Sequence, residues 1–325
     1  MFSLLTGAAM LALASAPAHH ATTCAPLRVM TYNIRLDLES DGINRWSNRK
    51  DQFSGQIALM HPAILGLQEV VARQKADLEQ ALPDYTFLGV ARDDGKSAGE
   101  FSNLAFDRNV FTAQSSGTFW LSPTPAVPSK GWDAAYKRVA TWAHLVRRGD
   151  GKRFLVLNTH LDNAGQQARL ESAKQIVRWL AANRRPNEAI VMTGDLNTES
   201  DTPPLRELTS ARLGLRDSRT ISKTPPVGPS GTWNDFQALP KTDGRIDFVL
   251  VDPTLEVERY AILAWHGRRG AHRIRSLPRR IRFASLQTVE LGRKYFTRPA
   301  GLRSSPAVRF SSHGIDFPSR RSREQ

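Results

Sequence analysis

Short apolar segments that run into polar residues recur along this 325-residue chain, and this pattern constrains the fold most. In the clearest case, residues 190–192 are followed by Thr193-Gly194 and then by Asp195 and Asn197. Four other segments carry polar residues at or near an end: Asn33, Glu69, Asn158 with His160, and Asp247. In α/β proteins such side chains face a shared ligand crevice. The pattern therefore predicts an α/β fold with its functional groups at one edge.

Apolar periodicity predicts the elements between these polar ends. Strands are expected near residues 27–33, 64–67, 85–90, 102–106, 139–147, 153–159 and 190–192, with a last strand at 246–251. Helices are expected near residues 51–60, 72–82 and 165–183. The proline-rich segments 120–132 and 220–231 are expected to be loops.

Each polar strand end has two interpretations. A capping residue or an Asx turn explains any one of them as well as a ligand site does. Asp195 and Asn197, however, would project from the same side of an extended backbone. Hard oxygen ligands held in this way suit Mg²⁺, which binds few carboxylates together with substrate phosphate. Five ends that combine carboxylates, amides and an imidazole favour one catalytic crevice.

The net charge of +14 is concentrated at one end of the chain. Residues 266–325 hold 15 Lys and Arg against three acidic residues, a net charge of +12. The remaining residues hold 30 basic and 28 acidic side chains, a net charge of only +2. The main body therefore has no excess charge that would steer polyanions toward it.

The N-terminus predicts export. Residues 1–21 (MFSLLTGAAMLALASAPAHHA) combine an apolar run with an Ala-x-Ala-type cleavage site and are too short to span a membrane, so we expect a signal peptide and a secreted or periplasmic protein. Cys24 is the only cysteine, so no internal disulfide can form.

Five motifs occur in one order along the chain: MTYNIR at 30–35, LQEV at 67–70, LNTHLD at 157–162, TGDLN at 193–197 and RIDF at 245–248. Together they resemble the endonuclease/exonuclease/phosphatase family, over about residues 27–251. The resemblance implies a four-layer α/β sandwich, in which two mixed β-sheets lie face to face with helices outside. It also implies a metal-dependent hydrolase of phosphoester bonds.

The resemblance assigns a metal site to this chain. Glu69 would be the principal Mg²⁺ ligand with Asn33 beside it, and Mn²⁺ is the alternative ion. Asp195 would contact the metal and orient or deprotonate the attacking water, and Asn197 would hold the metal or a phosphate oxygen. This inventory fits phosphoester hydrolysis, which needs an oriented water and neutralised phosphoryl oxygens.

The remaining assignments concern the phosphoryl group. His160 would donate a hydrogen bond to it, and Asn158 would contact the substrate phosphate. Asp247 would orient a second histidine near the end of the domain. Arg138 is a further candidate phosphate contact, and a solvated arginine at a strand end is the alternative.

The chain departs from the family pattern after residue 265. Family members close with a Ser-Asp-His-x-Pro-Val strand that is not found here. Residues 273–281 (RIRSLPRRI) can be encoded by CGC ATC CGA TCA CTT CCC CGT CGT ATC. One nucleotide later the same bases read Ala-Ser-Asp-His-Phe-Pro-Val-Val. We therefore expect a frameshift between about residues 265 and 273.

This reading divides the chain into a signal peptide (1–21), a family-like domain (25–265) and an Arg-rich tail (266–325), which is predicted to be non-native or disordered. The alternative is a genuine basic arm on a catalytically inactive family member that binds polyanions. The substrate stays open between nucleic acid, a phospholipid head group and a small phosphate ester, with a nuclease or phosphodiesterase as the default. Nothing indicates an obligate protein partner, and we expect a monomer.

Overall fold

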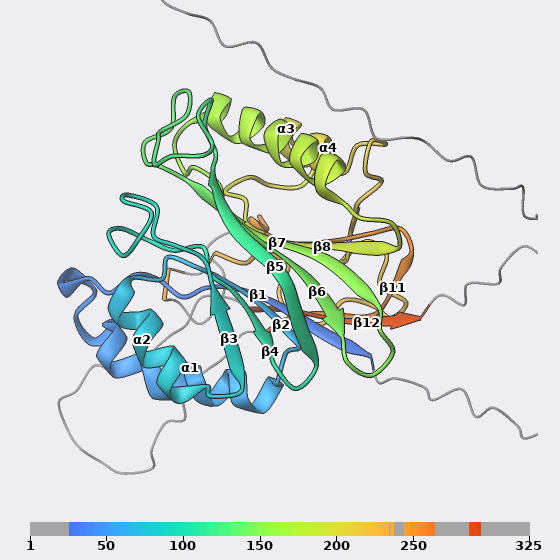
Figure 1. Cartoon of the computed structure of the whole chain (residues 1–325). Coiled ribbons are helices and arrows are strands. Elements are labelled where there is room, and N and C mark those ends of the chain that lie inside the picture. Colours follow the sequence, from blue (N-terminus) through green and yellow to red (C-terminus); the bar gives the residue numbers. More distant parts are fainter. Residues whose placement is uncertain (1–25, 234, 237–243, 264–285, 294–325) are drawn as a thin grey trace, which may run out of the picture. The chain divides into compact units, whose positions relative to one another are not determined.

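The computed structural model describes residues 26–233, 235–236, 244–263 and 286–293 (Figure 1). Two six-stranded sheets lie face to face, and helices cover both outer faces. This is the four-layer α/β sandwich of two mixed sheets predicted from the sequence. The predicted signal peptide and most of the basic tail lie outside the described residues.

The first sheet has the strand order β11-β12-β1-β2-β4-β3. Its only parallel pair within the described residues is β1 with β2. A 3₁₀ helix (Glu39–Asn44) precedes the two helices that cover this sheet, α1 (Trp46–Met60) and α2 (Ala72–Ala81). The strands are β1 (Leu27–Asn33), β2 (Ile64–Gln68), β3 (Tyr85–Leu88), β4 (Leu104–Asp107), β11 (Leu255–Leu263) and β12 (Leu286–Arg293).

The second sheet has the order β5-β6-β7-β8-β10-β9, and β7 with β8 is its parallel pair. Its outer face carries α3 (Gln166–Asn183) and the short α4 (Pro203–Leu208). The strands are β5 (Phe111–Trp120), β6 (Val139–Arg147), β7 (Arg153–His160), β8 (Glu188–Asp195), β9 (Arg216–Asp217) and β10 (Asp247–Val251).

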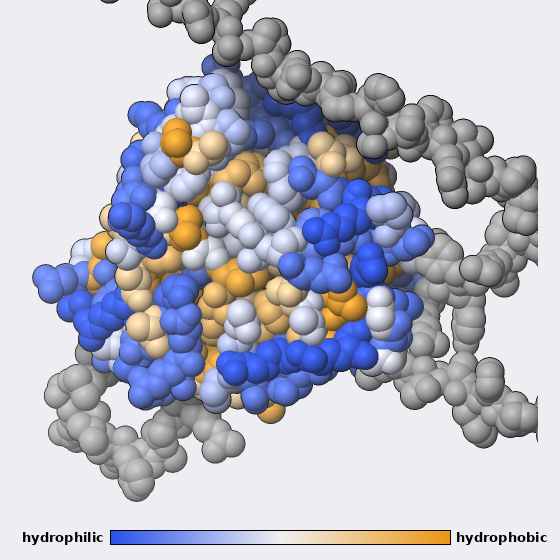
Figure 2. Space-filling view, in the orientation of Figure 1, coloured by the Kyte–Doolittle hydropathy of each residue, from blue (hydrophilic) through white to orange (hydrophobic). Residues whose placement is uncertain are grey.

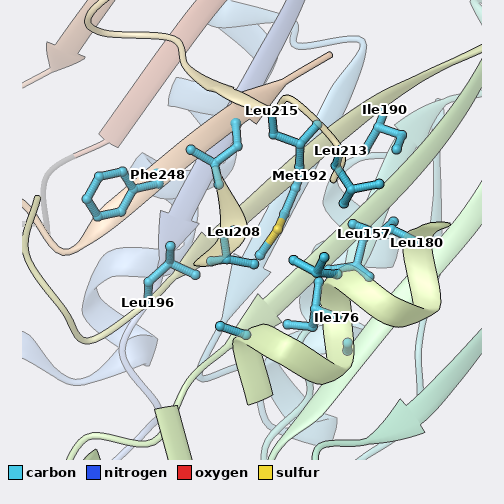
Figure 3. Close-up of a cluster of buried hydrophobic side chains, with 14 of the residues drawn as sticks. Leu157, Ile176, Leu180, Ile190, Met192, Leu196, Leu208, Leu213, Leu215 and Phe248 are labelled. Atoms are coloured by element: carbon cyan, nitrogen blue, oxygen red, sulfur yellow. The ribbon is translucent and has the colours of Figure 1, made fainter. Parts of the chain in front are cut away.

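Alternate residues of the central strands supply three separate hydrophobic clusters, one for each interface between layers. In β8, Val191 packs between the sheets, whereas Ile190 and Met192 pack beneath α3 and α4. Figure 3 shows this outer cluster, in which Met192 lies among leucines of the helices and the following loop. Because neighbouring side chains on a strand point to opposite faces, strands buried on both sides are apolar throughout.

The edge strand β5 differs from the central strands. Its residues are alternately exposed and partly buried over most of its length. In the view of Figure 2 the centre of the surface has intermediate hydropathy, hydrophobic patches lie beside it, and strongly hydrophilic residues lie toward the rim. None of the helices in the described ranges is both long and apolar enough to cross a bilayer.

The structure corrects several boundaries drawn from the sequence. Strand 246–251 is not the last, because β11 and β12 follow it and β12 pairs with both β1 and β11. The domain therefore does not end at residue 265. β5, rich in Ser and Thr, and the short α4 and β9 were also missed. The strand predicted near residues 190–192 is longer than expected, since β8 runs from Glu188 to Asp195.

A polar cluster joins the two sheets at their centre. Asn158, on β7, donates through Nδ2 to the backbone oxygens of Leu67 (2.9 Å) and Asn103 (2.8 Å). Its Oδ1 accepts from Gln68 Nε2 at 2.7 Å and from Thr193 Oγ1 at 2.9 Å. One fully buried amide thus bonds to residues of both sheets. A buried polar network satisfied in this way fixes one relative placement of its parts.

Gly66→Ala tests how much the fold depends on this cluster. A Cβ on Gly66 would clash with Thr193 Oγ1 and Asn158 Oδ1. We expect a loss of about 2–3 kcal/mol in the free energy of unfolding, because overpacking here also breaks hydrogen bonds. Urea denaturation measures it. Gly55→Ala is the matched control: its Cβ meets no atom within 4 Å on an exposed helix position, so it should stabilise the protein. Equal effects of the two substitutions would contradict the expectation.

Candidate active site

One end of the sandwich carries polar residues from both sheets. Asn33 ends β1 and Glu69 directly follows β2, while His160 and Asp195 end the parallel strands β7 and β8. Asp247 begins its strand rather than ending it. β10 runs antiparallel to β8, however, and pairs Asp247 with Asp195. The structure therefore brings these five predicted residues to one edge.

Asn33 links two carboxylates that come from different sheets. Its Nδ2 donates to Glu69 Oε1 at 2.7 Å and to Asp195 Oδ2 at 3.0 Å. The backbone N–H of Arg35 donates to Asn33 Oδ1 at 3.0 Å and so fixes the orientation of the amide. The N–H of Leu36 donates to Glu69 Oε2 at 3.2 Å. The carboxylates of Glu69 and Asp195 are thus held close together, and the Asn33 amide donates to both.

The backbone is strained at three positions of this edge. Arg35 and Glu69 have φ values of 60°, and Asn197 has a φ of 46°. Residues other than glycine rarely adopt such values, which cluster at functional sites. The N–H of Asn197 donates to Asp195 Oδ1 at 3.0 Å, which is an Asx turn. Asp195 and Asn197 therefore do not lie on one extended backbone. They form a turn, and both also line the cavity of the site.

His160 is buried among the polar groups of the site. Its Nε2 lies 3.0 Å from Asn197 Nδ2 and 3.7 Å from Asp195 Oδ2, and its Nδ1 lies 3.8 Å from Glu100 Oε2. Burial, reinforced by the nearby Arg138 guanidinium, holds the pKa of His160 well below its usual range. The imidazole is therefore neutral at pH 7.

The position of its proton follows from the contacts of Asn197. Asn197 Nδ2 also donates to the backbone oxygen of Leu161 at 2.9 Å, so the amide NH₂ faces the ring. Nε2 of His160 then accepts, and the proton of the neutral ring lies on Nδ1, facing Glu100. Before His160 can donate to a phosphoryl oxygen through Nε2, that oxygen must replace the Asn197 contact and Nε2 must gain a proton.

Arg138 is not the solvated strand-end arginine that the sequence left open. It is 5% exposed, and its Nε donates to Asp162 Oδ2 at 3.2 Å. Although burial alone would raise the pKa of Asp162, the backbone N–H groups of Gly165 and Ala135 lower it to about 2, and Arg138 adds to this effect. Arg138 is thus anchored on a carboxylate while it lines the site.

Asn158 does not contact the substrate phosphate as predicted. It is fully buried between the sheets, and its amide is bonded to Leu67, Asn103, Gln68 and Thr193. Both Asn158 and His160 lie on the face of β7 that points between the sheets, but only His160 stands at the strand end, where this space opens into the cavity. Asn158 is therefore an inter-sheet residue.

Asp247 is buried next to Asp195. Burial, and then the neighbouring carboxyl of Asp195, raise its pKa well above the usual range. The backbone N–H of Asp247 donates to Thr232 Oγ1 at 3.3 Å. The residues that would carry the second histidine, in the segment 264–285, lie outside the described part of the chain. The orienting role of Asp247 therefore stays a prediction.

The site opens into a cavity of about 710 Å³. Its walls include residues that the sequence analysis missed, chiefly Arg92 and Glu100, which face each other across a loop. Arg92 N donates to Glu100 O at 3.0 Å, and Arg92 Nη1 donates to Glu100 Oε2 at 2.9 Å. Burial raises the pKa of Glu100, and Arg92 offsets part of this effect. In sequence both residues lie in a Gly- and Asp-rich turn, where charges are usually solvated.

The donor set fits a divalent cation. In the described residues, no three His, Cys, Asp or Glu side chains form a closed cluster for a metal ion. Mg²⁺, however, needs only one or two carboxylates, because substrate oxygens and water complete its shell. Burial raises the pKa of Asp195 to about 6, and the charge of Glu69 contributes to this increase. A cation between these carboxylates would relieve their repulsion.

Comparison with known proteins identifies the relatives of this site. Residues 30–289 match the sequence profile of the endonuclease/exonuclease/phosphatase family. The chain belongs to this family. A family member from Bacteroides thetaiotaomicron is similar in structure, with 32% identity, a TM-score of 0.76, and coverage of 82% of this chain and 97% of that one.

Two further structures show the range of the family. A mannosyl-6-phosphatase from B. thetaiotaomicron has 33% identity and a TM-score of 0.74, with coverage of 82% of this chain and 99% of that one. TDP2 from D. rerio, complexed with single-strand DNA product, shares the fold at 15% identity, with a TM-score of 0.61 and coverage of 82% and 99%. Family membership and the similarity to the mannosyl-6-phosphatase support a phosphoester hydrolase.

Asp195→Asn should stabilise the metal-free protein at pH 8. The pKa of Asp195 is about 6 in the folded chain and 3.8 when the carboxyl is unperturbed, so above pH 6 the folded state holds a carboxylate that ionises more easily in the unfolded chain. We expect a gain on the order of 2 kcal/mol at pH 8, and little at about pH 3, where the carboxyl is mostly protonated in both states.

Thermal unfolding in EDTA at the two pH values measures this difference. Asp201→Asn is the control, because Asp201 is 89% exposed and its substitution should change stability by less than about 0.5 kcal/mol. A loss of stability at pH 8 on Asp195→Asn would show that Asp195 is not held as an unfavourable buried carboxylate.

Proposed function

We propose that this phosphoester hydrolase is an exported, divalent-metal-dependent enzyme that acts on small phosphate esters. The observation that carries the proposal is the placement of Glu69 and Asp195 on one amide, Asn33, opposite a neutral His160. Acceptors for a cation and donors for a phosphoryl group thus face the same cavity. Phosphoester hydrolysis requires both in one place.

Glu69, Asn33, Asp195 and Asn197 would hold the ion, with Mg²⁺ expected and Mn²⁺ as the alternative. A bound divalent cation supplies charge that neutralises the phosphoryl oxygens and polarises the phosphorus. The observation that supports the fit is the unfavourable proximity of two carboxylates, which raises the pKa of Asp195 beyond the effect of burial.

The protein's own groups position the reactants and move one proton. Asp195, whose pKa is about 6 in the metal-free protein, is ionised at neutral pH and would take a proton from an attacking water; a bound cation would lower this pKa. The Asn197 amide and the anchored Arg138 would donate to non-bridging oxygens as negative charge develops. His160 would accept a proton at Nε2, from the phosphate ester or water, before it donates there to the phosphoryl group, and Glu100 beside Nδ1 would stabilise the charged ring.

Two observations favour a small phosphate ester over nucleic acid. The chain outside residues 266–325 has a net charge of only +2, which provides little attraction for a polyanion. The mannosyl-6-phosphatase is twice as similar in sequence to this chain as the DNA-bound TDP2. A panel of mannose 6-phosphate, inositol phosphates, sphingomyelin, RNA and plasmid DNA, each with Mg²⁺, separates these substrate classes.

A second candidate function follows from the missing Ser-Asp-His motif. If the chain lacks the second histidine, it is a weak or inactive family member whose basic residues 266–325 bind polyanions. Two results together would favour this function. The chain would bind to heparin and lose this binding on truncation after residue 293, and it would hydrolyse no substrate of the panel.

Glu69→Gln should lower the rate of Mg²⁺-dependent hydrolysis by about 10³-fold, because the variant keeps the shape of the side chain but loses the charge that binds the metal. Glu79→Gln is the matched control on an exposed position of α2, and it should retain full activity. Initial rates on the substrates cleaved in the panel measure both. Equal rates for the two variants would remove Glu69 from the metal site.

The frameshift is tested on the gene itself. The coding sequence is expected to contain the codons for Ser-Asp-His one nucleotide out of frame, near residues 273–281. A chain with this frame restored should be at least about 10²-fold faster than the present one, since it regains a group for acid–base catalysis. If no other frame encodes the motif, the frameshift is wrong and the basic tail is native.

A further inference from the structure

Arg92 has hydrogen-bonding capacity that the proposed reaction does not use. The side chain is nine-tenths buried, yet among the described residues its guanidinium has one hydrogen-bond acceptor, Glu100. Its Nε is buried and lies 4.0 Å from Asp93 Oδ1, too far for a hydrogen bond, and has no other acceptor among the described residues. Buried arginines normally satisfy most of their five donors. Because Arg92 lines the cavity, acceptors on a bound molecule are its natural complement.

The loop around Arg92 is built rigidly. Asp93 N donates to Ala98 O at 3.0 Å, which continues the ladder formed by Arg92 and Glu100. Trp120 Nε1 donates to the backbone oxygen of Arg92 at 2.7 Å. Lys137 Nζ donates to the backbone oxygen of Asp93 at 2.7 Å. The guanidinium is thus held in position before any ligand binds, which lowers the entropy cost of recognition.

The immediate neighbours of Arg92 define the chemistry of the ligand. Glu100 adds an acceptor directly beside the donors, and its carboxyl disfavours a second anionic group at this point. A hydroxyl group both donates and accepts, so it matches this pair. Tyr136 is half exposed, and its ring lies 4.8 Å from the guanidinium carbon of Arg92. It presents a flat surface on which an aliphatic ring can pack.

We infer that Arg92, Glu100 and Tyr136 form a subsite for the hydroxyl-bearing part of the substrate, which makes the substrate a phosphomonoester of a sugar or another polyol. The inference rests on the proposed function, in which the phosphate would lie between His160 and Arg138, next to this subsite. A site built to bond hydroxyls discriminates strongly against analogues that lack them.

Equilibrium binding tests this subsite separately from hydrolysis. Mannose 6-phosphate and hexyl phosphate carry the same phosphate and a similar carbon skeleton, but only the first has ring hydroxyls. Calorimetry with Mg²⁺ in the Asp195→Asn background measures the ratio of their Kd values without turnover. Arg92→Met should reduce the preference for mannose 6-phosphate by about tenfold, the equivalent of one or two lost hydrogen bonds.

Two further variants make the result interpretable. Arg92→Lys keeps the charge but not the planar donor fork, so it should also lose most of the preference. Arg153→Met, on an exposed position at the start of β7, should leave it unchanged. Circular dichroism confirms that each variant is folded, and if Arg92→Met is not, the Lys variant decides.

The outcomes separate the subsite from the proposed function. An unchanged Kd ratio in both Arg92 variants, or no preference for mannose 6-phosphate in the parent, would overturn the subsite while hydrolysis of other phosphoesters could still support the function. Arg92-dependent binding of mannose 6-phosphate without hydrolysis by the unsubstituted chain would keep the subsite and remove the enzymatic function.

Discussion

The amide of Asn158 holds the two sheets in the one relation on which the site depends. It bonds to the ends of strands in both sheets, with backbone or side-chain partners at Leu67, Gln68 and Thr193. Glu69 follows Gln68, and Asp195 lies two residues after Thr193. The Asn158 amide uses both its N–H donors and its oxygen, so sliding one sheet over the other would break several buried hydrogen bonds. The two carboxylates therefore meet because the layers beneath them are locked.

The same packing explains the electrostatics of the site. Burial raises the pKa values of Asp195 and Asp247 and lowers that of His160. Each shift favours a neutral group in the folded protein and costs stability when the group is charged. Strained backbone at Glu69 and Asn197 adds to this cost. Stability is thus reduced at the edge where a phosphoryl group and a cation would bring compensating charges.

Local sequence patterns predicted the central strands, the main helices and the residues that meet at the site. These predictions were possible because a strand buried on both faces has an apolar sequence, and polar residues follow where the strand ends. The same patterns missed β5, β11 and β12, whose pairing depends on distant partners such as β6 and β1. They also missed Glu100 and Arg92, since a charged turn looks the same in sequence whether it is solvated or folded over a cavity.

Sequence alone determined the family, the four-layer fold and the identity of Glu69, Asp195, His160 and Asp247 as residues of one site. These conclusions follow from five short motifs and from the order in which they occur along the chain. Only the tertiary structure decided what each polar side chain contacts. It separated Asn158 from His160, because both lie on the face of β7 that points between the sheets, but only His160 stands at the strand end, where this space opens into the cavity.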